Sequence, residues 1–353
     1  MTELRSRSVS GSPGHCLKQE KNVVKHFLII AALLSLAPGV TFAGNQDAQV
    51  TLPPVHTYSI VCYDSVTGQI GAAVQSHYFR VCDVIHAEPG VGAVASQAFS
   101  DNRYWATGLE MIRSGKTAQE TLDSLLGTDE NREYRQVGMV DARGNSAGRT
   151  GKNCLAEGGS HIGHHFATQA SLMQNNTVWD AMAAAFETTQ GDLAERMMAA
   201  LEAAQAEGGD MRGMQSAAMI VVEGAPAAQP GGGRIVDLRV DDSPEPLREL
   251  RRLLTRNRAY GTMQEGHRVL FGGGSADQAW ELYLAATKLD PDNVELKFWP
   301  AINLVSVGQT DRALTLFKEV FAQEPHWRDI ILRLPRPDIL PDDSALIEKI
   351  LSQ

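Results

Sequence analysis

Short runs of hydrophobic and β-branched residues, separated by turn-forming sequences, dominate residues 57 to 245. Tyr58 to Tyr63 and Gln69 to Gln75 flank the turn Asp64-Ser65-Val66-Thr67-Gly68, a pattern that predicts a β-hairpin. The same pattern predicts further strands at Val91 to Ala98, Gln136 to Asp141, Ser146 to Thr150, Phe166 to Leu172, Ser216 to Val222 and Ile235 to Val240. This part of the chain is therefore rich in antiparallel strands.

Four stretches with the apolar spacing of amphipathic helices lie between these strands: Tyr104 to Ser114, Thr117 to about Leu126, Val178 to Glu187 and Asp192 to Glu207. The second one opens with Thr117-Ala118-Gln119-Glu120, which is a capping box. Two strands followed by two helices and then more strands indicate helices layered on antiparallel sheets, not a parallel βαβ sheet. We therefore predict an α+β domain over residues 57–245.

From Pro246 onward the pattern is helical only, and it repeats. Two turn-forming prolines, Pro291 and Pro325, are 34 residues apart. Three buried-type positions recur at the same spacing: Ala279 with Ala313, Tyr283 with Phe317 and Ala286 with Val320. A 34-residue period of this kind is typical of tetratricopeptide helix hairpins. The alternative is two ordinary helix pairs whose spacing agrees by chance.

Two repeats rarely form a stable stack alone, so flanking helices are expected to complete it. We predict one before the repeats, Pro246 to Tyr260, and a capping helix after them, Ser344 to Leu351. The sequence thus predicts an all-α tetratricopeptide-like domain over residues 246–353.

The first 43 residues have the pattern of a signal peptide. Lys25-His26 precedes an apolar run from Phe27 to Ala37, and Pro38-Gly39 then leads to Thr41-Phe42-Ala43, which has small residues where a signal peptidase cleaves. A membrane anchor is the alternative, but the run is shorter than the roughly 20 residues of a membrane span. We predict export to the periplasm or outside the cell, a leader over residues 44–56 and a true start near Val24.

The net charge of −10 places the chain among acidic proteins. Residues 1–43 hold five Lys or Arg and two Glu, a net charge of +3, so the mature chain would carry −13. No basic cluster is dense enough to follow a phosphate backbone, which argues against nucleic-acid binding. No metal-ligand spacing or phosphate-binding loop is present, so we expect no metal and no cofactor. Three cysteines remain after residue 43, which allows one disulfide and one buried thiol but implies no disulfide framework.

Seven motifs follow one another in the first domain: Thr57 to Val61, Gly71 to Ser76, Gly90 to Ala98, Arg135 to Gly138, Thr150 to Cys154, Gly208 to Ala217 and Asp237 to Asp242. Together they closely resemble a bacterial family catalogued as domain of unknown function 1028, over about residues 57 to 255. That family is similar to N-terminal-nucleophile hydrolases. The resemblance implies a four-layer αββα sandwich whose reactive side chain belongs to the first residue of the first strand.

The resemblance places Thr57 at the nucleophile position. A threonine hydroxyl needs a base within hydrogen-bond reach, and the residue's own α-amino group can supply it when the residue is the N-terminus. Thr57 is internal here, so this role requires cleavage of the His56–Thr57 bond. Otherwise Thr57 is an ordinary β-branched strand residue, and Ser59, on the same face, is a second candidate nucleophile.

Other candidates lie near strand ends in the matched motifs. Ser76 and Gln97 are candidate catalytic groups, and Gln75 is a candidate substrate-binding group. His161 is a candidate proton carrier, although His164 and His165 nearby show that histidines collect in this segment. Each of these residues has an alternative role in a turn or at a sheet edge.

The segment after Gly208-Gly209 supplies the remaining candidates for substrate binding: Asp210, Arg212, Gln215 and Ser216. A guanidinium fork suits carboxylate or amide recognition, and a salt bridge that locks the turn is the alternative. The chain departs from the family pattern at Thr168-Gln169-Ala170-Ser171, where Val-Gln-Gly-Asn is common, and at His77 and Cys82.

Two functions therefore remain open. The first is an amidohydrolase that forms an acyl-enzyme at Thr57 and acts on a small amide or peptide-like molecule. The second is a non-catalytic module that binds a ligand in the sandwich and a protein through the helical repeats. Fold does not decide between them, and the substrate and any homo-oligomer are not determined by the sequence.

Overall fold

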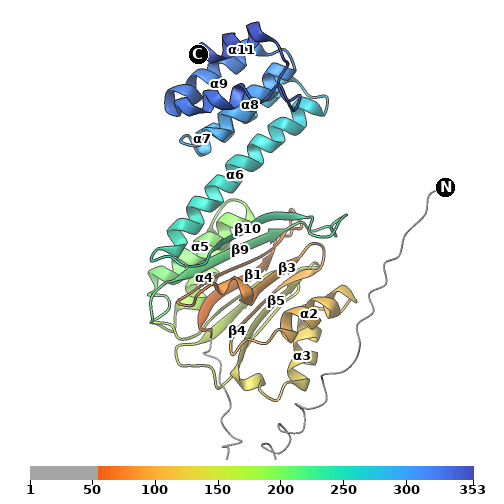
Figure 1. Cartoon of the computed structure of the whole chain (residues 1–353). Coiled ribbons are helices and arrows are strands. Elements are labelled where there is room, and N and C mark those ends of the chain that lie inside the picture. The colour runs from red at the N-terminus through yellow and green to blue at the C-terminus, as the bar shows by residue number, and fades with distance from the viewer. Residues whose placement is uncertain (1–54) are drawn as a thin grey trace, which may run out of the picture. The chain divides into compact units, whose positions relative to one another are not determined.

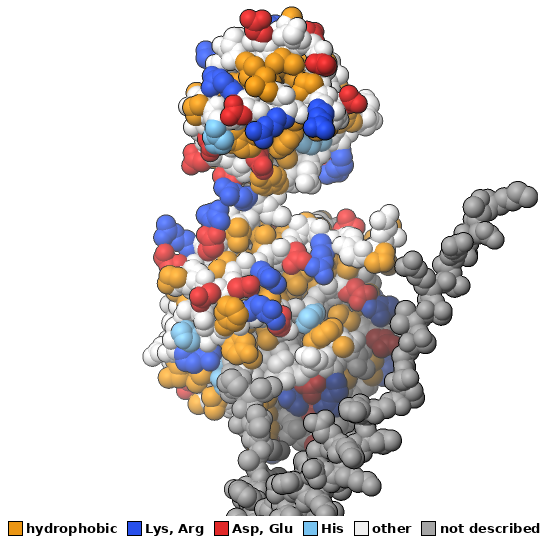
Figure 2. Space-filling view, in the orientation of Figure 1, with side chains coloured by type: hydrophobic (Ala, Val, Ile, Leu, Met, Phe, Trp, Pro, Cys, Tyr) orange, Lys and Arg blue, Asp and Glu red, His pale blue; other side chains and the backbone are white. Residues whose placement is uncertain are grey.

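A computed structural model describes residues 55–353 of the chain (Figure 1). The predicted signal peptide and residues 44–54 of the predicted leader lie outside the described residues. Figure 2 shows basic and acidic side chains intermixed over the visible face. Among the described helices, none combines the length and apolar character needed to cross a membrane.

Two antiparallel sheets form the first part of the chain. The larger sheet has the strand order β10-β9-β2-β1-β8-β7, and the smaller has the order β3-β4-β5-β6. The strands are β1 (Thr57–Tyr63), β2 (Ile70–Ser76), β3 (Ile85–Glu88), β4 (Gly92–Ala98), β5 (Arg135–Asp141), β6 (Ser146–Thr150), β7 (Gly159–Gly163), β8 (Phe166–Ala170), β9 (Ser216–Val222) and β10 (Arg234–Val240).

Successive side chains along the strands of the larger sheet point alternately to its two faces, which pack against different partners. In β1, Tyr58, Ile60 and Cys62 pack with residues of helices α4 (Val178–Thr188) and α5 (Leu193–Ala206). Val61 points the other way and joins Ala95 and Val140 of the smaller sheet in a separate cluster. Because side chains alternate with period two, one strand supplies both interfaces.

The outer face of the smaller sheet is covered in the same way. Val94 and Met139 pack against helices α2 (Arg103–Arg113) and α3 (Ala118–Thr128). The capping box at Thr117 is present, with Thr117 Oγ1 accepting from the Glu120 N–H at 3.1 Å. The packing order in this part is thus helices, sheet, sheet, helices.

The rest of the chain is helical: α6 (Pro246–Phe271), α7 (Ala276–Leu289), α8 (Glu295–Ser306), α9 (Thr310–Gln323), α10 (Arg328–Ile331) and α11 (Ser344–Leu351). The predicted end of the first helix at Tyr260 is wrong, because α6 continues without a break to Phe271. Its first half, with Leu250 and Leu254, packs in the core of the larger sheet. Its second half, with Met263, packs in the core of the helical part.

The predicted mixed α/β part followed by a helical part is confirmed. Two strands, β3 and β7, are absent from the sequence prediction. The three cysteines in the described part of the chain, Cys62, Cys82 and Cys154, are unpaired.

Candidate functional site

A layer of buried polar side chains lies between the two sheets near the start of β1. Ser59, Gln97, Gln136 and Gln169 each have no exposed surface. Ser59 Oγ donates to Gln97 Oε1 at 2.5 Å and accepts from Gln169 Nε2 at 2.6 Å. Gln97 Nε2 in turn donates to Gln136 Oε1 at 2.7 Å. These hydrogen bonds offset the free-energy cost of burying polar side chains between the two sheets.

This polar layer also holds the main chain of Thr57. Gln97 Nε2 donates to the Thr57 carbonyl oxygen at 2.9 Å, and the Ser171 N–H donates to the same oxygen at 3.1 Å. Gln136 is fixed by donating to the Ala170 carbonyl at 2.8 Å. The first residue of β1 is therefore held by groups from β4 and from the end of β8.

The carbonyl group just before Thr57 accepts two short hydrogen bonds. Ser76 Oγ and Arg212 Nη2 each donate to the His56 carbonyl oxygen at 2.6 Å. Ser76 is directly opposite Thr57 in the β1–β2 register, which places its hydroxyl at this position. Two fixed donors on one carbonyl oxygen are the arrangement that stabilises an oxyanion during acyl transfer.

Asp210 sets the direction of the Arg212 guanidinium. Its carboxylate accepts from Arg212 Nε at 3.0 Å and from Arg212 Nη2 at 2.7 Å. The His77 N–H also donates to Asp210, at 3.2 Å, and the carboxylate is fully buried. Gly208 and Gly209 precede it with φ of 103° and 61°, which glycine adopts without strain. The result is a rigid cation aimed at the His56 carbonyl.

The His56 side chain is buried beside this pair, with 2% of its surface exposed. Its Nδ1 lies 3.2 Å from Ser171 Oγ. Burial, and then the nearby Arg212 cation, lower the pKa of His56 to about 4, against an opposing effect of Asp210. The imidazole is therefore neutral at pH 7.

Thr57 itself is fully buried, and its nitrogen is part of the His56–Thr57 peptide bond. Its hydroxyl donates to the Val55 carbonyl oxygen at 2.9 Å. Val55 pairs with Ala98 through two main-chain hydrogen bonds, of 2.8 and 2.9 Å. The residues before Thr57 thus cover the hydroxyl.

Six residues predicted from the sequence are brought together here: Thr57, Ser59, Ser76, Gln97, Asp210 and Arg212.

Three of the other predicted residues lie elsewhere. Gln75 is opposite Tyr58 in the register, so it faces the helices, not the second sheet. His161 bonds Asp180 of α4 through Nδ1 at 2.8 Å and likewise lies on the helix side. Gln215 donates its side-chain amide to Asp242 at 3.1 Å. None of these three side chains has a hydrogen bond to the group around Thr57 in the described structure, although the Gln215 main-chain N–H donates to the Ser76 carbonyl at 3.0 Å.

Ser216 has a supporting position. Its hydroxyl donates to the Tyr78 carbonyl at 2.5 Å and accepts from the Val81 N–H at 3.0 Å, which ties the segment after β2 to β9.

Sequence reasoning missed four residues of this site: His56, Gln136, Gln169 and Ser171. Gln136 and Gln169 alternate with apolar residues on predicted strands, so their inward direction was available from period two. His56 and Ser171 meet only through the fold, 115 positions apart.

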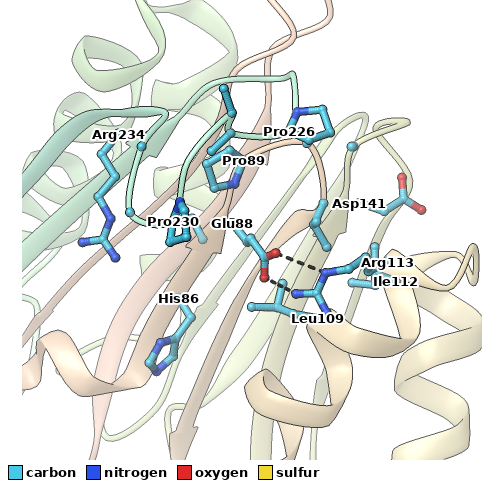
Figure 3. A pocket seen from close by; sticks show the side chains of 18 of the residues that line it. His86, Glu88, Pro89, Leu109, Ile112, Arg113, Asp141, Pro226, Pro230 and Arg234 are labelled. Atoms are coloured by element: carbon cyan, nitrogen blue, oxygen red, sulfur yellow. Dashed lines mark hydrogen bonds and ion pairs between the residues drawn. The ribbon is translucent and has the colours of Figure 1, made fainter.

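A second hollow, of about 930 Å³, lies at the opposite end of the sheets (Figure 3). It is lined by β3, by the turn that leads into β4, by α2 and by the loop before β10. Ala98, which pairs with Val55, lies at the other end of β4. Its Glu88 is paired with Arg113 through bonds of 3.2 and 2.5 Å, as Figure 3 shows. The His86 ring stacks on Trp105 at 4.0 Å. The charges of Glu88 and Arg113 are thus already paired with each other in this hollow. We therefore place the candidate site at Thr57.

Comparison with known proteins gives a family but no activity. The sequence pattern of DUF1028, described as a family of unknown function, matches residues 57–250. A crystal structure of a protein from Silicibacter pomeroyi, assigned to the same family, is 29% identical, with a TM-score of 0.51. That match covers 57% of this chain and 88% of the other. Among functionally curated proteins, none matches.

Proposed function

The chain belongs to the DUF1028 family, whose function is unknown, and we propose that it is an exported amidohydrolase of the N-terminal-nucleophile type with Thr57 as its nucleophile. The family's four-layer sandwich, with the reactive residue at the start of its first strand, is part of this proposal. Thr57 begins β1 and lies beside the buried polar layer.

The observation that carries the proposal is the double hydrogen bond on the His56 carbonyl, from Ser76 Oγ and Arg212 Nη2 at 2.6 Å each. This carbonyl is joined to the Thr57 nitrogen, so attack on it by the Thr57 hydroxyl closes a five-membered ring. The oxygen would become an oxyanion between two donors that are already in place. A donor of this kind is typically worth about 3 kcal/mol in the transition state.

Cleavage of the His56–Thr57 bond would give Thr57 a free α-amino group, whose pKa is ordinarily near 8. That amine can take the hydroxyl proton as Thr57 Oγ1 attacks the carbonyl carbon of an amide substrate. The leaving amine then receives the proton, and a Thr57 ester remains. Water hydrolyses the ester and restores the hydroxyl.

The surrounding residues would have distinct tasks in this reaction. Ser76 and Arg212 would bind the developing oxyanion where they now bind the His56 carbonyl. Asp210 would position Arg212, and Gln97 would position Thr57 through its carbonyl. The reaction uses no group outside the chain except water.

The export and repeat parts of the proposal have separate support. The Lys25 to Ala43 pattern supports export to the periplasm or outside the cell. For the helical part, the recurring positions Ala279 and Ala313, Tyr283 and Phe317, and Ala286 and Val320 are all buried, as expected for tetratricopeptide repeats that present a surface to a protein partner.

A non-catalytic binding module is the second candidate function. It is favoured by one observation: Thr57 is buried, and its nitrogen is acylated by His56. In that case the residues before Thr57 would stay in place, and the polar layer would only stabilise the sandwich.

Hydrolysis assays separate the two candidates. We would test a chain beginning at Thr57, its Thr57→Ala variant and a chain beginning at Gly44 against a panel of N-acyl amides and short peptides. The proposal expects activity from the first chain, none from the second and less from the third. Equal activity in the Thr57→Ala variant would contradict it.

A further inference from the structure

The two residues before Thr57 lie in the site as the acyl half of a substrate would. The Val55 N–H donates to the Ala98 carbonyl at 2.8 Å, and the Ala98 N–H donates to the Val55 carbonyl at 2.9 Å. The next carbonyl, that of His56, is the one between Ser76 and Arg212. Val55 and Ala98 form an antiparallel bridge. An extended chain therefore approaches the nucleophile along the end of β4.

Ala98 is shaped to receive such a chain. Its φ is 60°, a left-handed conformation that a non-glycine residue rarely adopts and that is often retained at functional sites. Ala98 is 1% exposed with Val55 in place, and its N–H and C=O would both lose their hydrogen-bond partner if Val55 departed. Buried main-chain groups need partners, and a peptide residue supplies one donor and one acceptor at this spacing.

The environment of the His56 side chain indicates what a substrate can place there. The ring is buried against Ser171 Oγ and next to the Asp210–Arg212 pair. Arg212 disfavours a second cation at this position, and burial disfavours any uncompensated charge. The low pKa of His56 agrees with a subsite for a neutral side chain.

We propose, on the basis of the function proposed above, that the substrate is a peptide whose acyl side binds as Val55 and His56 do. One residue forms the two main-chain hydrogen bonds with Ala98. The next residue carries the attacked carbonyl and a neutral polar or aromatic side chain, which lies beside Ser171.

The reaction then has defined products. The amide bond after the His56-like residue breaks, and its carbonyl carbon forms an ester with Thr57 Oγ1. The hydroxyl proton passes through the Thr57 amine to the departing nitrogen. Water cleaves the ester and gives a peptide with a free C-terminal carboxylate. That carboxylate would lie beside Arg212, so a peptide ending in Val-His is a product and a suitable binding probe.

Calorimetry with such a probe tests the subsite without requiring turnover. The protein is the chain beginning at Thr57, with its Thr57→Ala variant in parallel, and the probe is acetyl-Pro-Pro-Val-His with a free carboxylate. Two matched probes replace Val by N-methyl-Val, which removes the donor to Ala98, or His by Arg. We expect the parent probe to bind both proteins and each altered probe to bind at least tenfold more weakly.

Failure of the parent probe to bind, or equal binding of all three probes, would overturn the peptide subsite. Binding of the parent probe without hydrolysis of the matching amide would overturn the amidohydrolase and leave the subsite standing. Hydrolysis of small amides without probe binding would overturn the subsite alone.

A second measurement covers the case in which the chain beginning at Thr57 does not fold. In the full-length Thr57→Ala chain, Val55→Pro removes the N–H that donates to Ala98. We expect main-chain hydrogen exchange around Ala98 to become at least tenfold faster. Unchanged exchange would show that Val55 does not occupy this position and would overturn the inference.

Discussion

Ser76 stands directly opposite Thr57 in the β1–β2 pair, and its hydroxyl donates to the carbonyl of the residue before Thr57 at 2.6 Å. The β1–β2 register alone therefore fixes the position of the candidate nucleophile relative to one of the two oxyanion donors. A slip of β1 by one residue would turn the Thr57 side chain to the helix-covered face and separate it from Ser76.

Replacing Ser76 tests this donor. Ser76→Ala should lower kcat by about 100- to 1000-fold, since one of two donors to the oxyanion is lost. Folding should weaken by only about 1 kcal/mol. The measurement is kcat beside a thermal melt. Ser146→Ala is the matched control, because Ser146 Oγ also donates to a main-chain carbonyl, that of Gly163, at 2.7 Å. A loss of activity no larger than that of the control would remove Ser76 from the mechanism.

Substitutions of Thr57 test the nucleophile. Thr57→Ser should keep part of the activity, because a hydroxyl remains beside the amine. Thr57→Ala should abolish the activity. In a chain that retains Val55 it should also destabilise the fold by about 1 kcal/mol, the worth of the hydrogen bond from Thr57 to Val55. Steady-state kinetics and denaturant unfolding check the two effects. If Thr57→Ser and Thr57→Ala were equally inactive while both stayed folded, the hydroxyl would not explain the chemistry.

The buried His56 should make the free energy of unfolding depend on pH. Its pKa is near 6.5 in the unfolded chain and about 4 in the folded one, so below pH 6.5 the unfolded state binds more protons. Stability should fall as the pH drops from 6.5 to 4, by at most about 3 kcal/mol. Urea unfolding of the Thr57→Ala chain, with His56→Gln added as the control, measures this. Identical pH profiles for the two chains would contradict the buried neutral imidazole.

A buried ion pair outside the site gives a stability prediction. Asp129, 2% exposed, accepts from Arg135 Nε at 2.8 Å and from the Tyr104 hydroxyl at 3.0 Å. Asp129→Ala should cost about 1–3 kcal/mol, because Arg135 and the buried Tyr104 hydroxyl each lose a hydrogen-bond partner, while Arg135 keeps Asp101 at 3.2 Å. The exposed pair of Arg80 and Asp83 is the comparison, and Asp83→Ala should cost under about 1 kcal/mol. Similar midpoints of thermal unfolding for the two variants would contradict the predicted difference between a buried and an exposed ion pair.

Local sequence patterns predicted most of the fold of residues 57–245, because strands such as β1 and β9 are apolar runs bounded by turns. Two strands lacked this signal. β3 is only four residues long, and β7 begins and ends with glycine, so pairing with neighbours defines both.

The helix α6 was predicted too short for a related reason. Gly261 follows Tyr260 and suggests an end, yet one glycine costs only about 1 kcal/mol in a helix. Leu254 on one side and Met263 on the other are buried in different cores, and this packing carries the helix through the glycine.

The site was predictable in part. Motifs indicated Thr57, Ser76, Asp210 and Arg212, but not that the carbonyl of His56 joins them. That contact depends on the meeting of segments 156 positions apart. Gln75 was wrongly predicted to belong to the site. It is adjacent to Ser76 in the chain, but side chains alternate along a strand, so it points to the opposite face of the sheet.

The N-terminal residue of the protein, isolated from its natural compartment in active form, tests the central claim most directly. Mass spectrometry of the intact chain and of its first peptide would identify it. We predict Thr57, with a free α-amino group beside its hydroxyl. An active preparation whose only N-terminus is Gly44 would contradict the mechanism.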